Sequence, residues 1–448
     1  MGEGSAARLI RSFTVGGRTA DIAGRRRSVF NNRPAAFAEL KKNVKTSRRQ
    51  FLQTASLAIL HPCTRAITAE AALIESIEKV VLAAPPVKGG TWFHPRACVA
   101  GKKVFMTLQT IQGSDYFGPV HWTTSEDLGK TWSEFQPAPP LGWVPLPEGG
   151  NEGVCDVTPE FHPTTGSVLA FGHNVFYKAA HFDRDQPARW PVYAVWKDGP
   201  WGPRQKLVWD DPRGSYIYSN NCGQRVTLPD GDVMMSFTFG VKGKARAVCG
   251  VRCSFDGKQL IVKQTGPELT NPKGRGLLEP SLTRFKNRFY LTIRAEDDRG
   301  YVAVSDDGLN YEPKQPWTWD DGEPLTMSTT QQHWLTHSDA LFLVYTRKDA
   351  TNANVFRWRA PLLVAQVDPK TLQLIRATER IVLPLVGDGV NAADLVPMMG
   401  NFGVANITPN ESWVTDGSWC PKAGNSGELQ LARIRWSQPN RPTRGGVN

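Results

Sequence analysis

The stretch that most constrains the fold is Ser-Glu-Asp-Leu-Gly-Lys-Thr-Trp at residues 125–132, which follows the strand-like run 120–124. We expect the Ser hydroxyl and the Asp carboxylate to accept hydrogen bonds from backbone amides of a turn. The Gly takes a positive φ, and the Trp begins the next strand by packing its ring against the hairpin. The stretch therefore predicts a β-hairpin with a defined turn.

The hairpin pattern recurs along the chain. Weaker copies occupy residues 254–260 (Ser-Phe-Asp-Gly-Lys-Gln-Leu), 305–311 (Ser-Asp-Asp-Gly-Leu-Asn-Tyr), 196–201 (Trp-Lys-Asp-Gly-Pro-Trp) and 367–372 (Val-Asp-Pro-Lys-Thr-Leu). Their spacing of roughly 50–70 residues suits four-stranded propeller blades with loop insertions. The alternative is a set of unrelated Asp-Gly hairpins in another β fold.

The octapeptide resembles the Asp box of sialidases and related bacterial-neuraminidase-repeat propellers. The resemblance implies an all-β fold, a sialidase-like β-propeller of six blades, with seven as the alternative number. Strand-like runs bounded by turn residues agree with it. They lie at residues 104–108, 167–171, 233–237, 288–293 and 340–345. We predict a basic leader and linker at 1–84, the propeller at 85–437, and a polar tail at 438–448.

Basic residues are concentrated in the leader. The whole chain has a formal net charge of +11, but residues 1–50 hold 12 Lys or Arg against three acids. A nucleic-acid-binding protein would carry its basic residues on the folded body, so we predict no nucleic-acid partner. No long uncharged apolar segment is present, and we predict no stable membrane insertion.

The leader contains Ser47-Arg48-Arg49-Gln50-Phe51-Leu52, followed by a modest apolar stretch at 55–60. This pattern looks like a twin-arginine export signal, with a disordered basic tail as the alternative. It predicts a periplasmic or extracellular protein. The seven cysteines form no CxxC pair and no zinc spacing, and we expect most to be buried. We predict no cofactor and no metal site, with a structural calcium ion left open.

In sialidases, three arginines hold the sugar carboxylate, a Tyr is the nucleophile, a Glu activates it, and an Asp serves as acid and base. The best match here is Glu279-Pro280-Ser281 together with Arg294 at the end of the run 288–293. The resemblance implies that Glu279 is the activating base and Arg294 a carboxylate ligand. The alternative is an ion pair that joins two blade strands.

The other expected residues follow the same resemblance. In place of the family's first arginine motif the chain has Phe93-His94-Pro95-Arg96, so either Arg96 or His94 takes that position. Asp115, ten residues before the octapeptide, matches the acid/base Asp or is a solvated turn residue. Arg347 is the best third arginine, with Arg357 and Arg359 behind it.

The family's nucleophile has no counterpart, because no Tyr follows Tyr345. Tyr345, Tyr216 or Tyr218 would have to substitute. Histidine is the alternative, since it transfers protons near neutral pH. The candidates that could converge at the centre of a propeller are His94, His121, His173, His333 and His337. This combination resembles a propeller branch that cleaves rhamnose linked to glucuronate with a histidine.

These patterns predict an exported, sialidase-like enzyme that cleaves a terminal acidic sugar from a glycan. The expected catalytic residues are His94, Asp115 and Glu279. The expected substrate-binding residues are Arg96, Arg294, Arg347, His173 and His333. A histidine-dependent rhamnosyl-glucuronate lyase or hydrolase and a non-catalytic glycan-binding propeller are the alternatives, since a fold does not fix a function.

Overall fold

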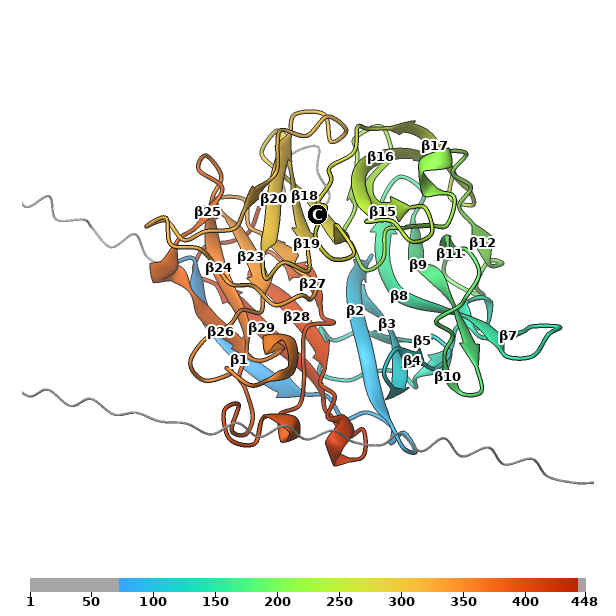
Figure 1. Cartoon of the computed structure of the whole chain (residues 1–448), viewed down its shortest axis with the longest axis horizontal. Helices are drawn as coiled ribbons and strands as arrows, with labels where there is room; N and C mark the ends of the chain where they lie inside the picture. Colours follow the sequence, from blue (N-terminus) through green and yellow to red (C-terminus); the bar gives the residue numbers. More distant parts are fainter. Residues whose placement is uncertain (1–71, 442–448) are drawn as a thin grey trace, which may run out of the picture. The chain divides into compact units, whose positions relative to one another are not determined.

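Six antiparallel sheets make up the part of the chain that the computed structural model describes, residues 72–441 (Figure 1). The predicted twin-arginine signal lies outside the described residues, as do Cys63 and residues 442–448 of the predicted tail. No helix in the described part is long and apolar enough to cross a membrane.

The first three blades follow one another along the chain. Blade 1 contains β2 (Thr91–Ala100), β3 (Lys103–Gly113), β4 (Tyr116–Phe117), β5 (His121–Ser125) and β6 (Gln136–Pro137). Blade 2 contains β7 (Val144–Pro145), β8 (Asn151–His162), β9 (Ser167–Lys178), β10 (His181–Phe182), β11 (Pro191–Trp196) and β12 (Gln205–Lys206). Blade 3 contains β13 (Ile217–Ser219), β14 (Val226–Thr227), β15 (Val233–Gly240), β16 (Ala247–Phe255) and β17 (Leu260–Thr265).

The other three blades follow the same plan. Blade 4 contains β18 (Leu278–Phe285), β19 (Arg288–Arg294), β20 (Gly300–Ser305) and β21 (Gln315–Pro316). Blade 5 contains β22 (His333–Thr336), β23 (Leu341–Tyr345), β24 (Leu362–Asp368), β25 (Gln373–Leu374) and β26 (Arg380–Leu383). Blade 6 contains β27 (Gly403–Thr408), β28 (Glu411–Gly417), β29 (Leu429–Trp436) and β1 (Ile74–Val81). The six-bladed prediction and all five predicted strand runs are confirmed.

Short 3-10 helices occur only in connections within residues 72–441. They are η1 (Pro139–Leu141), η2 (Pro212–Gly214), η3 (Phe356–Trp358), η4 (Arg376–Thr378), η5 (Ala393–Leu395) and η6 (Pro421–Ala423).

The N-terminal strand β1 closes the ring. It pairs with β29 along seven residue positions and forms the outer edge of blade 6. The predicted propeller start at residue 85 is therefore wrong, because the blade already begins at Ile74. The first and last described strands meet in one sheet, so the ring closes by hydrogen bonds that the sequence does not reveal locally.

The octapeptide at 125–132 forms the expected turn. The Asp127 carboxylate accepts hydrogen bonds from the amides of Lys130 and Thr131 at 3.1 and 2.9 Å, and the Ser125 hydroxyl accepts from Gly129 at 2.7 Å. Gly129 has a φ of 77°. Trp132 packs against the core of blades 1 and 6, but the next strand begins only at Gln136.

The innermost strands form the centre of the propeller. β2 contacts β8 on one side and β27 on the other, and β18 lies between β15 and β22. In Figure 1, β2 (blue) lies between β3 and the red strands β27 and β28. Apolar side chains fill the space between neighbouring blades, and the six described cysteines are all buried and unpaired. The ends of the central strands are thereby held at fixed positions around the axis.

Candidate functional site

A cavity of about 840 Å³ opens at one end of the central strands. Loops and strand ends of blades 1–5 contribute its wall. Charged residues dominate the lining: Arg184, Arg189, Arg246, Arg275, Arg294 and Arg357, with Asp115, Asp156, Glu279 and Glu296. Since a propeller's central end is a common place for ligands and this cavity gathers ionisable groups, it is the candidate site.

Bulges in the central strands aim three side chains at this end. The strand register shifts between Phe93 and Arg96 in β2, between Cys155 and Thr158 in β8, and between Leu278 and Ser281 in β18. Each bulge holds one non-glycine residue with positive φ: His94 at 52°, Asp156 at 57° and Glu279 at 44°. Such a backbone conformation is unfavourable for these residues and concentrates at functional sites. A bulge in the central strand therefore sets the position of one polar side chain in each of blades 1, 2 and 4.

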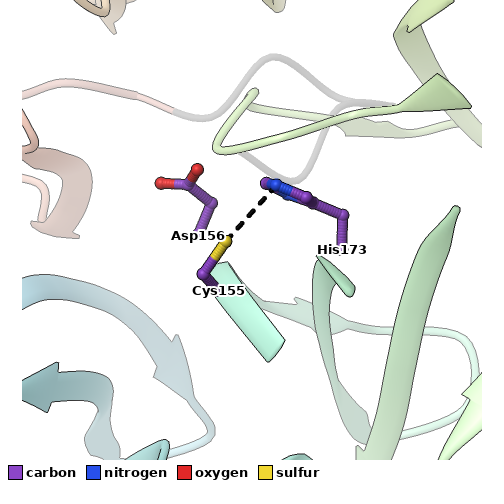
Figure 2. A group of neighbouring side chains, drawn as sticks. All are labelled: Cys155, Asp156 and His173. Atoms are coloured by element: carbon purple, nitrogen blue, oxygen red, sulfur yellow. Dashed lines mark hydrogen bonds between the residues drawn. The ribbon is translucent and has the colours of Figure 1, made fainter. Parts of the chain in front are cut away.

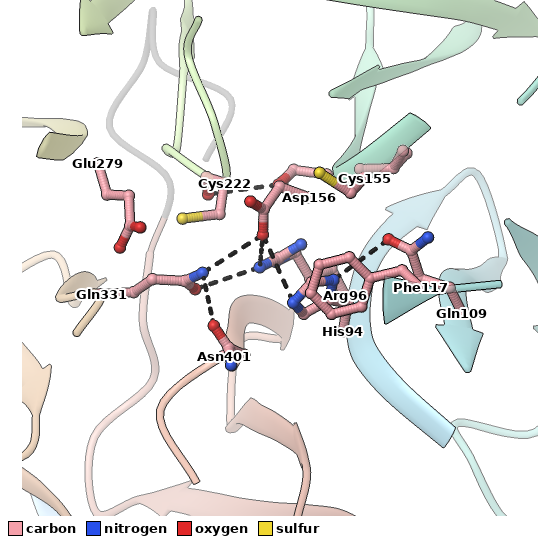
Figure 3. A network of polar contacts seen from close by, with 12 residues as sticks. His94, Arg96, Gln109, Phe117, Cys155, Asp156, Cys222, Glu279, Gln331 and Asn401 are labelled. Carbon is pink, nitrogen blue, oxygen red and sulfur yellow. Dashed lines mark hydrogen bonds and ion pairs between the residues drawn. The ribbon is translucent and has the colours of Figure 1, made fainter. Parts of the chain in front are cut away.

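Asp156 is the centre of a polar network at the base of the cavity (Figure 3). Its carboxylate accepts a hydrogen bond from Arg96 at 3.1 Å and one from Gln331 at 3.4 Å, and it lies 3.6 Å from Nε2 of His94. Burial opposes ionisation of Asp156, but the positive potential of His94 and Arg96 outweighs it and holds the pKa of this carboxyl well below its ordinary value. Asp156 is therefore an anion at neutral pH.

The tautomer of His94 follows from its neighbour Gln109. The Gln109 amide nitrogen donates to the carbonyl oxygens of Gly118 and Val154, so the Gln109 oxygen faces Nδ1 of His94 at 3.2 Å and accepts a hydrogen bond from its N–H. The Nε2 atom then faces Asp156. Burial lowers the pKa of His94 to about 4, although Asp156 opposes this. His94 is thus a neutral imidazole at pH 7.

Glu279 and Arg294 form an ion pair within the cavity wall. They lie on neighbouring strands, because Leu278 of β18 pairs with Arg294 of β19. Arg294 also lies 3.8 Å from Glu296. Nε of Arg275 donates to the Glu296 carboxylate at 2.8 Å. Four charges of alternating sign thus form one chain along the wall. The second oxygen of Glu279 is buried and has no hydrogen-bond partner within the described residues.

Four further arginines of the cavity have no carboxylate partner among the described residues, and one of them, Arg184, is exposed. Arg189, Arg246 and Arg357 make no ion pair within 4.0 Å with any acid of residues 72–441. Burial and then the charge of Arg189 lower the pKa of Arg246 to about 10, and burial and then Arg294 lower the pKa of Arg357. All three remain cations at pH 7. Unpaired guanidinium groups that share one cavity provide a binding site for an anion.

Cys155 and His173 meet next to Asp156 (Figure 2). The Cys155 sulfur lies 3.3 Å from Nε2 of His173, and Arg189 donates to the same nitrogen at 3.5 Å. Burial, followed by Arg189, lowers the pKa of His173 to about 3, and burial raises the pKa of Cys155. The three side chains offer potential metal ligands within 4.8 Å of one another, but the Arg189 cation competes for the nitrogen. The arrangement therefore favours an anion over a metal ion.

Four of the eight predicted site residues line the cavity: Asp115, His173, Glu279 and Arg294. His94 and Arg96 lie behind Asp156 on its buried side, where Arg96 donates to the carboxylate at 3.1 Å and Nε2 of His94 lies 3.6 Å from it. His333 is buried further back, where it contacts Ser281 at 2.9 Å and Gln331 at 3.3 Å. It supports the network and does not line the cavity.

Arg347 lies elsewhere. Its guanidinium binds the carboxylate of Glu379 in blade 5, with Nε at 2.8 Å, and it does not line the cavity. The cavity instead contains Arg357, whereas Arg359 is half-buried and donates to the carbonyl oxygen of Met399 at 2.7 Å. We therefore leave Arg347 out of the site.

Of the three tyrosines that could replace the family's nucleophile, only Tyr216 lines the cavity. The Tyr345 hydroxyl donates to Glu379 at 2.6 Å, and Tyr218 is bound to backbone groups of blade 2's outer connection. Tyr216 makes one long contact, at 3.3 Å, to the carbonyl oxygen of Gln186. Outside the cavity, His121 contacts Pro119 and His337 contacts Gln438.

The sequence reasoning missed Asp156, Arg189, Arg246, Arg275 and Glu296. Asp156 occupies a bulge equivalent to those of His94 and Glu279, and only the register of β8 against β9 reveals it. The others lie in connections between strands, and only the closed ring brings them together.

Comparison with known proteins agrees with this fold. No protein-family model and no curated protein sequence matches the chain. A crystal structure of a Dyadobacter fermentans protein of unknown function superimposes with a TM-score of 0.59 and 13% identity, over 81% of this chain and 100% of that one. Trypanosoma rangeli sialidase with the inhibitor DANA and a Hadza microbial sialidase each give 0.56 and 12% identity over 77% of this chain. The chain spans 55% and 66% of those two sialidases. It has a sialidase-like six-bladed β-propeller fold.

Proposed function

We propose that this chain is a sialidase-like carbohydrate-active enzyme that cleaves a terminal acidic sugar from a glycan. The observation that carries the proposal is that Arg189, Arg246 and Arg357, together with the exposed Arg184, line one cavity without an acid within 4.0 Å in residues 72–441. A planar guanidinium binds a carboxylate through two parallel hydrogen bonds, so it fixes both the position and the orientation of such a sugar.

Two carboxylates of the cavity supply the chemistry. Glu279 has a buried oxygen without a hydrogen-bond partner among the described residues, and Asp115 is exposed at the β3–β4 turn with a φ of 55°. In our proposal Asp115 protonates the glycosidic oxygen while Glu279 directs a water molecule to the sugar. This is the division of labour of an inverting glycosidase, and it needs no tyrosine nucleophile.

A specific observation supports a second reaction, histidine-dependent elimination at a uronate. His94 is neutral, and Gln109 directs its Nε2 toward the site. A neutral imidazole can remove a proton, and the arginines would stabilise the negative charge that develops on the substrate. In this reaction His94 acts from behind Asp156, so the substrate would have to displace that carboxylate.

Product analysis distinguishes these reactions. The purified protein is incubated with sialylated and with rhamnosyl-glucuronate-terminated oligosaccharides, and the products are identified by mass spectrometry. Hydrolysis adds one water molecule across the products, whereas elimination leaves an unsaturated, ultraviolet-absorbing sugar. Glu279→Gln abolishes hydrolysis by our proposal, and His94→Ala abolishes elimination. Arg376→Ala, at an exposed site outside the cavity, is the matched control.

Two outcomes contradict the proposal. Acidic glycans that bind but are never cleaved would make the chain a glycan-binding propeller. Neutral glycans that are cleaved as well as acidic ones would remove the role of the arginines.

We also propose that the protein is exported through the twin-arginine pathway, on the basis of Arg48 and Arg49 in the leader. Replacing both by Lys keeps the full chain in the cytoplasm by this proposal, as measured by cell fractionation. Unchanged export would contradict it.

A further inference from the structure

Five of the cavity's arginines form an arc across four successive blades. Arg189 precedes β11 of blade 2, Arg246 precedes β16 of blade 3, and Arg275 and Arg294 belong to the β18–β19 region of blade 4. Arg357 follows β23 of blade 5. Because the blades are arranged in ring order, the arginines follow one another along the cavity wall in the order of the chain.

Backbone hydrogen bonds between blades fix this arc. The amide of Arg189 donates to the carbonyl oxygen of Tyr216 in blade 3 at 2.9 Å. The amide of Arg246 donates to the carbonyl oxygen of Arg275 at 2.8 Å. Gly276 permits this approach, since a Cβ there would lie 2.2 Å from the carbonyl oxygen of Arg246. Hydrogen bonds between neighbouring blades therefore fix the main-chain positions of Arg189, Arg246 and Arg275.

The middle of the arc is already neutralised, but its two ends are not. Glu279 and Glu296 bind Arg294 and Arg275. Arg189 and Arg246 at one end have no acid within 4.0 Å in residues 72–441, and neither does Arg357 at the other. Six arginines against four carboxylic acids leave the cavity lining with two positive charges in excess when all are ionised.

A single sugar carboxylate can neutralise only one end of this arc. If Arg189 and Arg246 bind it, the acid-paired residues of blade 4 separate it from Arg357. The remaining cation then faces the same cavity without a partner. An unpaired charge that is desolvated by a bound ligand is costly, so the arrangement favours a ligand that places a second anion beside Arg357.

We propose that the cavity recognises a glycan with two anionic groups on successive sugar residues, one at Arg189 and Arg246 and the other at Arg357. This inference rests on the proposed function, which concerns the terminal acidic sugar. It adds that the next sugar residue of the glycan must also carry an anionic group. The second group is an oxyanion, either a carboxylate or a sulfate ester, because a guanidinium group binds both through paired hydrogen bonds.

Binding of matched ligands tests the requirement. Isothermal titration compares a non-cleavable, sulfur-linked trisaccharide carrying uronates at two successive residues with the same molecule methyl-esterified at the inner uronate. A third ligand carries a sulfate ester in place of the inner carboxylate. We expect the diacid to bind roughly tenfold or more tightly than the ester, as for one charge-assisted contact.

The variant Arg357→Asn isolates the second subsite. Arg357 has a φ of 53°, a conformation that Asn tolerates, so the loop retains its backbone. We expect this variant to bind the diacid and the ester equally, with the ester's affinity unchanged from the wild type. Arg376→Ala, outside the cavity, should retain the full preference for the diacid. Thermal unfolding of each variant confirms that it is folded.

The outcomes separate this inference from the proposed function. Equal affinity of the wild type for the ester, the diacid and the sulfated ligand overturns the second subsite and leaves the first intact. Absence of binding to all three ligands overturns both. If only the sulfated ligand binds more tightly than the ester, the second subsite is a sulfate site. If only the diacid binds more tightly than the ester, it is a carboxylate site.

Discussion

Removing the charge of Asp156 should destabilise the propeller markedly. Arg96 is 1% exposed, and Asp156 is the only carboxylate within 4.0 Å of it in the described chain. Two of its nitrogens, Nε and Nη1, have no hydrogen-bond partner there. Asp156→Asn preserves the size of the side chain but leaves a buried cation without its counter-charge. Breaking a buried ion pair in this way costs about 3–5 kcal/mol of unfolding free energy.

Urea unfolding followed by tryptophan fluorescence measures this loss. The matched control is Glu78→Gln, which removes the charge of a surface carboxylate 3.7 Å from Arg435, with both side chains more than half exposed. Surface pairs of this kind contribute about 0–1 kcal/mol, so the control should unfold close to the wild type. If Asp156→Asn is as stable as Glu78→Gln, the network around Arg96 does not depend on the charge of Asp156, and our account of the cavity base is wrong.

Three further predictions concern stability, pH and catalysis. Because His94 has a folded-state pKa of about 4 against an ordinary 6.5, the unfolded chain binds more protons between these values. The contribution of His94 to the unfolding free energy should therefore be fully present above pH 6.5 and should fall by about 3 kcal/mol toward pH 4. Urea midpoints should fall over the same range, and a constant midpoint would contradict burial of the neutral imidazole. Gly129→Ala should destabilise the protein more than Gly101→Ala does. Both glycines have positive φ, but only a Cβ at residue 129 would meet another side chain, that of Trp413 at 2.5 Å. Equal melting temperatures of the two variants would refute the close packing of this turn. Glu279→Gln should lower kcat by about 100-fold or more with a smaller change in KM, and a normal kcat would exclude Glu279 from the chemistry.

The sequence was informative wherever structure is local. The turn at 125–132 depends on hydrogen bonds within five residues, and the pattern of Ser, Asp and Gly is sufficient to specify it. Glu279 and Arg294 could be paired for a similar reason, since they face each other across a single hairpin. Both interactions leave a spacing in the sequence that can be read directly.

Interactions that depend on ring closure left no such spacing. β1 pairs with a strand more than 350 residues away, and its segment therefore looked like part of the linker. Arg347 occupies the expected end of β23, but Glu379, on the connection before β26, captures its guanidinium. Arg189 and Arg246 reach the cavity only because loops of neighbouring blades bind each other through their backbones. Tertiary placement of this kind cannot be read from residue types alone.

The bulges explain why the site was only partly predicted. The resemblance to sialidases pointed to His94 and Glu279, whereas Asp156, which precedes Val157 in an otherwise regular strand, matched no motif. A positive φ at a non-glycine residue cannot be recognised from a single sequence. Asp156 therefore became visible only when the register of β8 against β9 was known.

The central claim is that the arginines of the cavity bind the carboxylate of an acidic sugar. Its most direct test is isothermal titration of the wild type and Arg246→Ala with a terminally acidic, sulfur-linked oligosaccharide and with its neutral carboxamide analogue. We predict that the wild type prefers the acid by about tenfold or more, and that Arg246→Ala loses most of this preference. Equal affinity of the wild type for acid and carboxamide would contradict the claim.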